Sequence, residues 1–285
     1  MARPLRIELA DGVYHVVARG NERKLIYRDE ADRETFLATL DQTRSRFGWL
    51  ILCYCLMGNH YHLLVRTARP NLARGMCHLN GVYAKRFNRR HGRVGHLFQA
   101  RYHAILVQQD EHLVATVRYI VNNPVRAHIV ASCEDWRWSS HRATLGKQPP
   151  GLLALDALLQ HFDEHDRSRA RQRYRELIGQ SADPPTPHGV VLGSEQFVSA
   201  VTRAIELRSE IPRQHIRPVR PTLEQIFEHR RQSEAIAAAY RQYDYTLREI
   251  AGHLGCHYAT ISRRLRAHEQ RTHSGDVLQR KTWHR

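Results

Sequence analysis

The first half of the chain contains a clear β-hairpin pattern. An unbroken apolar run, Trp49–Met57, is followed at once by Gly58 and Asn59 and then by a second short run, His60–Arg66. Short apolar runs bounded by turn residues are typical of strands, and a Gly-Asn pair permits a tight turn between antiparallel strands. The pattern therefore predicts two paired strands, which excludes an all-helical fold for this part of the chain.

Strand-like and helical patterns alternate around this hairpin. The expected elements are, in chain order, a strand at Gly12–Arg19, a helix at Glu30–Phe47, the two hairpin strands, a helix at Asn71–Arg90, a strand at Tyr102–Val107 and a helix at Asp110–Asn122. Pro124 is expected to end the last helix, because proline restricts the residue before it and cannot continue the helix. The order βαββαβα predicts an α+β fold with a ferredoxin-like sheet and its helices on one face.

Beyond residue 138 the patterns are helical with intervening loops, which predicts an all-α tail. Helices are expected at Leu152–Phe162 and Asp166–Ile178. Segments that contain proline indicate two linkers, one at Ser181–Pro187 and one around Pro212, Pro218 and Pro221. We therefore expect an α+β domain at residues 1–145, a helical extension at 146–220 and a small helical domain at 221–285.

The segment Tyr245–His268 has the pattern of a helix-turn-helix. Apolar residues recur on one face of a first helix, Gly255 permits a tight turn, and further apolar residues anchor a second helix. A plain helical hairpin has a similar periodicity, so the pattern leaves DNA binding open. If the second helix enters a major groove, the expected base or phosphate contacts are His257, Tyr258, Thr260 and Arg263.

The chain is strongly basic, and the basic residues are concentrated. With 44 Lys and Arg against 28 Asp and Glu, the formal net charge is +16, which favours a polyanionic partner such as nucleic acid. The 68 residues between Asp41 and Asp110 contain no acidic residue and 11 basic ones. Within this window the expected contacts to the DNA backbone are Lys85, Arg86, Arg89, Arg90, Arg93 and Arg101. A solvated basic helix end is the alternative interpretation.

We expect a cytoplasmic protein with no membrane partner. The apolar run Trp49–Met57 is about half as long as a bilayer crossing requires, and Met1–Pro4 opens no signal-peptide core. The five cysteines include no pair with the spacing of a metal or redox motif. Cys53 and Cys55 are therefore predicted to be small buried apolar side chains on a strand.

Two pairs of residues could carry chemistry. His60 and His62 are two apart on the second hairpin strand, so both side chains project from one face of the sheet. Neutral imidazoles can bind a divalent cation and leave most of its coordination sphere free for water and phosphate oxygen. Tyr119 and Asn123 are four apart near the end of a helix and share one face. A solvated histidine pair and a packed aromatic ring are the alternative interpretations of these spacings.

Three motifs resemble those of a known family. They are Met57–Val65 with its two histidines around Tyr61, Gly95–Tyr102 before the fourth expected strand, and Tyr119–Ala127 at the end of the expected helix. In this order they resemble the single-tyrosine HUH transposases, and within that family the REP-associated tyrosine transposases. The resemblance covers about residues 11–145 and includes the similar segment Trp136–Ser140.

The resemblance implies a reaction and its residues. His60 and His62 would bind Mg²⁺ or Mn²⁺, and Asn123 stands where insertion-sequence relatives usually carry Gln as a third ligand. Tyr119 would attack a DNA phosphorus and form a 5′-phosphotyrosine, so that single-stranded DNA at hairpin-bearing ends is nicked and rejoined without ATP. Two other functions stay open, a non-catalytic DNA-binding regulator and a metal-dependent hydrolytic nuclease. Monomer and homodimer both remain open as well.

Overall fold

The computed structural model describes residues 7–109, 111–180, 185, 187, 190–209, 221–228, 230–243 and 245–268. The chain divides into two compact units, Met1–Leu207 and Arg208–Arg285. The two predicted linkers that contain proline lie mostly outside the described residues. Among the helices that are described, none is long and apolar enough to cross a membrane.

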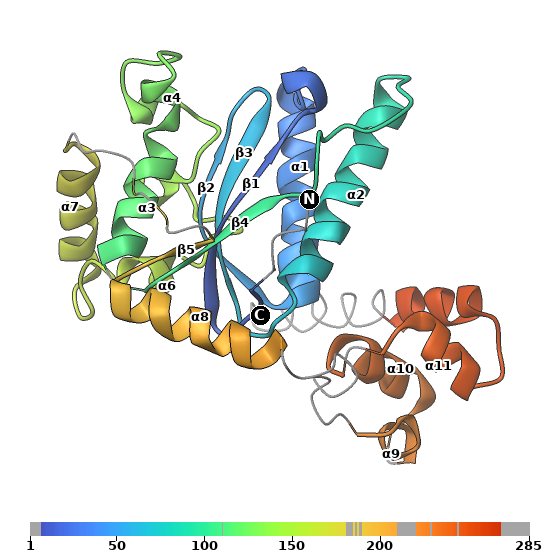
Figure 1. Ribbon diagram of the computed structural model, residues 1–285. Coiled ribbons are helices and arrows are strands. Elements are labelled where there is room, and N and C mark those ends of the chain that lie inside the picture. The colour runs from blue at the N-terminus through green and yellow to red at the C-terminus, as the bar shows by residue number, and fades with distance from the viewer. Residues whose placement is uncertain are drawn as a thin grey trace, which may run out of the picture. The chain divides into compact units, whose positions relative to one another are not determined.

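The first unit is built around one five-stranded sheet (Figure 1). Its strands are β1 (Gly12–Arg19), β2 (Trp49–Leu56), β3 (His60–Thr67), β4 (His103–Val107) and β5 (Val191–Leu192), in the spatial order β2-β3-β1-β4-β5. The first four strands pair antiparallel, and β5 pairs parallel with β4. The predicted α+β class, the hairpin and the order βαββαβα are confirmed. The fifth strand comes from the segment predicted to be a helical extension.

Helices cover both faces of this sheet. Helices α1 (Glu30–Phe47) and α2 (Leu72–Arg90) lie on one face, whereas α3 (Glu111–Val121) and α7 (Arg167–Ile178) lie on the other (Figure 1). The prediction that the helices cover a single face is therefore wrong. The reason is in the strands, since β2 is buried almost throughout and has apolar side chains to cover on both sides.

Two separate hydrophobic cores result from this arrangement. Alternate residues of β1 point to opposite sides, so that Tyr14 packs with α1 and α2 while Val13 packs with α3 and α7. A register shift between Ile51 and Cys53 marks a bulge in β2. Cys53 and Cys55 lie fully buried in the second core, as predicted, and burial raises the pKa of the Cys53 thiol to about 12.

The end of α3 is shaped by Pro124. Helix α3 stops at Val121, and Asn122 begins a separate single turn, α4 (Asn123–Arg126), with Pro124 in its first positions. Proline suits this place because the first turn of a helix has no partner for its backbone N–H groups. The predicted helix end is confirmed, and the short helix that follows presents Asn123 and Arg126 beyond Tyr119.

Short elements complete the first unit. They are η1 (Asn21–Arg23), η2 (Cys133–Asp135), α5 (His141–Thr144) and α6 (Leu155–Leu159). The longer helix α8 (Glu195–Ser209) follows β5 and ends two residues past Leu207. The segment after α4 is fixed to the edge of the sheet, because the Trp136 indole donates a hydrogen bond to the carbonyl of Leu56 at 3.1 Å. In the second core α6 and α7 pack on β2 and α3.

The second unit is a small helical cluster. It contains α9 (Leu223–Glu228), α10 (Gln232–Arg241), α11 (Leu247–His253) and a further helix over residues 258–268. Thr246 caps α11 through a capping box with Glu249, and Gly255 in the turn has a φ of +59°, which favours glycine. Ile250 and Ile261 are fully buried in the core of this cluster.

Candidate active site

The two histidines of β3 lie side by side on the sheet face that α3 covers. Their ring centroids are 5.1 Å apart. His60 is partly exposed, and its Nδ1 lies 2.7 Å from the side-chain oxygen of Asn59. Because Asn59 donates its amide nitrogen to the carbonyl of Arg23, its oxygen is left to accept. His60 therefore carries its hydrogen on Nδ1 and keeps a lone pair on Nε2.

The second histidine, His62, has one nitrogen bonded and one free. It is buried, with 4% of its surface exposed, and its Nδ1 lies 2.9 Å from Nε2 of His15 on β1. Its Nε2 is buried without a hydrogen-bond partner in the described part of the chain. An unpaired buried nitrogen is costly, and a cation that it coordinates would remove that cost.

Tyr119 of α3 reaches these imidazoles. Its ring centroid lies 5.7 Å from that of His62 and 5.8 Å from that of His15, with edge-to-face angles of 85° and 73°. The side chain is only partly buried, which leaves the ring at the open edge of the second core. The structure thus brings Tyr119 next to His62, whose ring lies beside that of His60, although the tyrosine and the histidines are about sixty residues apart in sequence.

All three imidazoles of the site are held neutral. Burial, followed by the nearby Arg19, lowers the pKa of His60 to about 4. Burial, followed by His103, lowers the pKa of His15 to about 4 as well. The pKa of His62 is lowered well below its usual range by burial first and then by the charges around it. Neutral imidazole is the form that binds metals, so these shifts prepare the pair for a cation near pH 7.

The donors fit a divalent cation with an incomplete protein shell. Asn123 donates its amide nitrogen to the carbonyl of Tyr119 at 2.9 Å, so only its oxygen is left to face a cation. The described residues contain no group of three or more His, Cys, Asp and Glu side chains that could hold a metal ion. Two imidazoles and one amide oxygen would leave the remaining positions to water and to a phosphate oxygen.

Three residues of the site were not found from the sequence. His15 and Arg19 face the same side of the sheet as His62, because β1 pairs with β3 in the register Val17 to His62. The guanidinium carbon of Arg126 lies 4.9 Å from the centroid of the Tyr119 ring. Residue spacing could have identified these residues. His15 and Arg19 are four apart on one strand, so they share a face, and Arg126 follows Tyr119 by seven residues, which is about two helical turns.

The predicted basic DNA contacts divide into two groups. Arg86 and Arg90 are engaged within the protein: Arg86 donates to Thr39 and Gln42, and Arg90 to the carboxylates of Asp29 and Asp32. Three others have exposed side chains, namely Lys85, Arg89 and Arg101. Arg93 is partly exposed, with its guanidinium 5.7 Å from the ring of Phe87.

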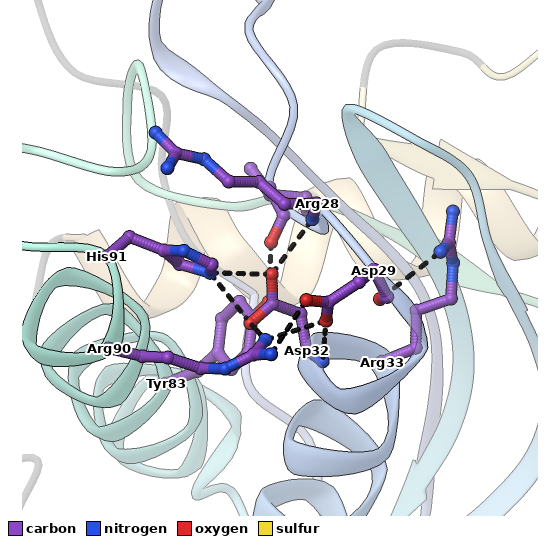
Figure 2. Close-up of polar contacts among 8 residues, drawn as sticks. Arg28, Asp29, Asp32, Arg33, Tyr83, Arg90 and His91 are labelled. Carbon is purple, nitrogen blue, oxygen red and sulfur yellow. Dashed lines mark hydrogen bonds and ion pairs between the residues drawn. The ribbon is translucent and has the colours of Figure 1, made fainter.

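Arg90 belongs to an ion-pair cluster that joins α1 to α2. Asp32, with 1% of its surface exposed, accepts from Arg90 at 2.6 Å and lies 2.9 Å from Nε2 of His91 (Figure 2). Arg90 also bonds both oxygens of Asp29, and these bonds lower the pKa of Asp29 to about 2. Arg90 therefore has a structural role that accounts for its position, which differs from the predicted role in DNA binding.

The predicted contacts of the second unit lie at the start of the helix over residues 258–268. His257, Tyr258 and Arg263 are exposed, and Thr260 is partly exposed. The rings of His257 and Tyr258 lie with their centroids 4.4 Å apart. With 47% of its surface exposed, Tyr258 presents an aromatic face that no other part of the helical cluster covers fully.

Parts of the chain are similar to known proteins. Residues 9–123 match the family described as transposase IS200 like. A curated protein of Haemophilus influenzae, named as a REP-associated tyrosine transposase, is 26% identical over 119 residues, which are 38% of this chain and 68% of that protein. A solved REP-associated tyrosine transposase bound to a REP hairpin has a TM-score of 0.48 and 14% identity, over 67% of this chain and 97% of that one. Residues 9–123, which hold both histidines and the tyrosine, are therefore similar to the IS200-like transposases.

Proposed function

We propose that this chain is a metal-dependent transposase that nicks and rejoins single-stranded DNA at hairpin-bearing ends through Tyr119. The observation that carries the proposal is the position of the Tyr119 ring, 5.7 Å from the ring of His62. A phenol beside a pair of neutral imidazoles combines a nucleophile with ligands for a cation that binds phosphate. The similarity of residues 9–123 to the IS200-like transposases supports a DNA-processing reaction of this kind.

His60, His62 and the side-chain oxygen of Asn123 would hold Mg²⁺ or Mn²⁺. When bound, the cation would neutralise the scissile phosphate and polarise its P–O bonds. Tyr119 then forms a bond from its phenol oxygen to phosphorus as the bond from phosphorus to the 3′ oxygen breaks. The phenol loses its proton, the departing 3′ oxygen gains one, and a 5′-phosphotyrosine and a free 3′-OH result. Attack by another 3′-OH on the phosphotyrosine rejoins a strand without ATP, because the ester bond is conserved.

Arginines flank the reacting groups. Arg126 lies over the Tyr119 ring, and Arg19 is close enough to lower the pKa of His60. Both side chains are exposed and can reach the oxygens of a bound phosphate diester. We assign them to holding the phosphate in line with the tyrosine, which is the geometry that the attack requires.

The substrate part of the proposal rests on charge and on the relatives. Lys85, Arg89 and Arg101 are exposed, as phosphate contacts must be. Lys85 and Arg101 also line a cavity of about 880 Å³ between α2 and the segment that leads into β4. The relative from Haemophilus influenzae is named for its association with REP sequences, and we extend that association to this chain.

The second unit would add a further DNA contact. Its helix over residues 258–268 begins with the exposed pair His257 and Tyr258, and Arg263 lies one turn later. A helix that presents such side chains near its N-terminus can enter a major groove, with Thr260 as a further contact.

Covalent capture tests the proposed function. A hairpin oligonucleotide labelled at its 3′ end is incubated with the full chain and Mn²⁺, and denaturing gels report any label that migrates with the protein. We expect an adduct with the wild type and with Tyr54→Phe, a control on β2 outside the site, and no adduct with Tyr119→Phe at retained DNA affinity.

The other functions give different results in the same assay. An adduct that persists in Tyr119→Phe contradicts the assigned nucleophile. Cleavage that leaves only free ends indicates a hydrolytic nuclease, and binding without cleavage in the wild type indicates a regulator.

A further inference from the structure

His15 is a polar residue in a place where the strand needs an apolar one. It lies in the middle of β1, between Tyr14 and Val16, and faces the second core together with Val13. Only 7% of its surface is exposed. A buried imidazole costs free energy unless its nitrogens are bonded, so its presence calls for a specific partner.

That partner is His62. Nε2 of His15 lies 2.9 Å from Nδ1 of His62, and the two rings are nearly parallel, with an interplanar angle of 21°. His62 stands opposite Val17 and His15 opposite Leu64, so the two histidines are diagonal neighbours on one face of the sheet, offset by two residues. Strand pairing thus fixes both backbones, and the bond fixes the orientation of the His62 ring.

Only one arrangement of hydrogens suits a metal ligand. Two neutral imidazoles can share this bond only if one donates and the other accepts. If His62 accepted, its hydrogen would lie on Nε2, which is buried without a partner among the described residues. If His62 donates from Nδ1, the lone pair lies on Nε2 and is available to a cation. His60 has the same arrangement, since its Nδ1 is bonded to Asn59.

We infer that His15 is a positioning residue, which accepts the hydrogen bond from Nδ1 of His62 and so aims the lone pair of Nε2 at the cation. The inference rests on the proposed function, because that function makes His62 a metal ligand. Metal-bound histidines usually depend on such an outer partner, and loss of the partner typically weakens metal binding by about 10- to 100-fold. His15 would act on the cation only through His62.

Packing alone is the competing explanation, and two variants separate it from the inference. His15→Phe keeps a flat ring against His62 and Tyr119 but has no acceptor. His15→Gln loses the ring but keeps an acceptor that can reach Nδ1 of His62. Under the inference Gln rescues what Phe removes, whereas under a packing role Phe is the better replacement.

The experiment uses the full chain without DNA and measures two quantities. Mn²⁺ affinity is followed by electron paramagnetic resonance, and the His62 tautomer by ¹⁵N spectra of the imidazoles, with His62→Ala identifying the signals. We expect His15→Phe to weaken Mn²⁺ binding by about 10- to 100-fold and to remove the Nδ1–H signature of His62. His15→Gln and the surface control His165→Gln should stay within about threefold of the wild type in Mn²⁺ affinity, a margin well below the loss of an outer partner.

The two proposals fail in different ways. Equal Mn²⁺ affinity of the wild type and His62→Ala would contradict the metal centre, and the metal-free tautomer spectra would still decide the role of His15. Unchanged Mn²⁺ affinity and an unchanged Nδ1–H signature in His15→Phe would overturn the inference while leaving the metal centre in place. A fall in thermal stability without a change in tautomer would likewise count for packing and against it.

Discussion

The guanidinium of Arg126 lies over the ring of Tyr119, with 4.9 Å between its central carbon and the ring centroid. The two residues come from different helices, α4 and α3, and the break at Asn122 sets their approach. A cation in this place can bond the oxygens of a phosphate as charge develops on them. Under the proposed function, Arg126 would therefore contact both Tyr119 and the phosphate that it attacks.

We predict that Arg126→Gln slows formation of the covalent adduct by about 10- to 100-fold, less than the loss of a fully buried transition-state donor because the side chain is exposed. The measurement is the single-turnover rate with a hairpin oligonucleotide. Arg126→Lys should lose less, because the charge remains. Arg118→Gln is the matched control. Arg118 directly precedes Tyr119 in α3, and consecutive residues on a helix do not face each other. An Arg126→Gln rate equal to that of Arg118→Gln would contradict the role.

Neighbouring arginines at the end of α2 should behave in opposite ways. Arg89 is exposed, whereas Arg90 bonds Asp29 and the buried Asp32. Arg89→Gln should leave the thermal midpoint unchanged and reduce the salt dependence of DNA binding by about one phosphate contact. Arg90→Gln should lower the thermal midpoint. Asp32→Asn, which weakens the acceptor shared by Arg90 and His91, should cost roughly 3 kcal/mol of unfolding free energy.

Thermal melts give the midpoint of the Arg89→Gln and Arg90→Gln variants, and DNA affinity measured at several salt concentrations gives their salt dependence. The assignment of Arg90 fails if its Gln variant melts like the wild type and loses salt dependence as Arg89→Gln does.

The order of strands and helices could be predicted because it depends on local patterns. A few adjacent residues determine the hairpin at Gly58 and Asn59, and the same holds for the helix end at Pro124. Both predictions are confirmed. The place of α3 could not be predicted in this way. Its face depends on which side of β2 remains uncovered after α1 and α2 have packed, which is a property of the assembled sheet.

The site residues also divide into those that short sequence motifs predict and those whose contacts depend on how the strands pair. His60, His62 and Tyr119 could be named from short motifs, and the structure places them together. His15 could not be named, because its contact with His62 depends on the register between β1 and β3. The basic neighbours of Arg90 in the sequence suggest a DNA contact, whereas its partners Asp29 and Asp32 lie about sixty residues earlier in the chain.

Acid should destabilise the first unit before most carboxylates titrate. Burial lowers the pKa of His141 from 6.5 to about 4, and His15 and His60 are lowered to the same value. Between pH 6.5 and 4 the unfolded chain therefore binds protons that the folded chain excludes, so stability is full above pH 6.5 and falls as the pH drops. For His141 alone the loss at pH 5 is about 2 kcal/mol.

Urea unfolding followed by tryptophan fluorescence at pH 7.5, 6.0 and 5.0 measures this slope. His141→Gln should have a smaller dependence on pH than the wild type, whatever its absolute stability, and His165→Gln should keep the full dependence. An unchanged slope in His141→Gln would mean that His141 binds protons equally in the folded and unfolded chains, which would contradict the lowered pKa.

Two glycines of α2 give a matched pair of stability predictions. Both lie inside the helix, where alanine is favoured over glycine by up to about 1 kcal/mol. A Cβ at Gly81 meets nothing within 4 Å, so Gly81→Ala should raise the unfolding free energy by roughly that amount. A Cβ at Gly75 would overlap the indole ring of Trp49. That ring cannot move aside, because its nitrogen donates to Asn71 at 2.9 Å and Asn71 in turn bonds the carbonyl of Phe47.

Gly75→Ala should therefore lower the unfolding free energy by about 1–3 kcal/mol despite its better helix propensity. Urea unfolding of both variants at pH 7.5 shows whether each substitution raises or lowers the unfolding free energy. The double variant Gly75→Ala with Trp49→Phe makes room at the contact, and it should recover part of the loss relative to Trp49→Phe alone. If Gly75→Ala is as stable as Gly81→Ala, then Trp49 does not pack against α2 as described, and the anchoring of β2 to that helix has to be sought elsewhere.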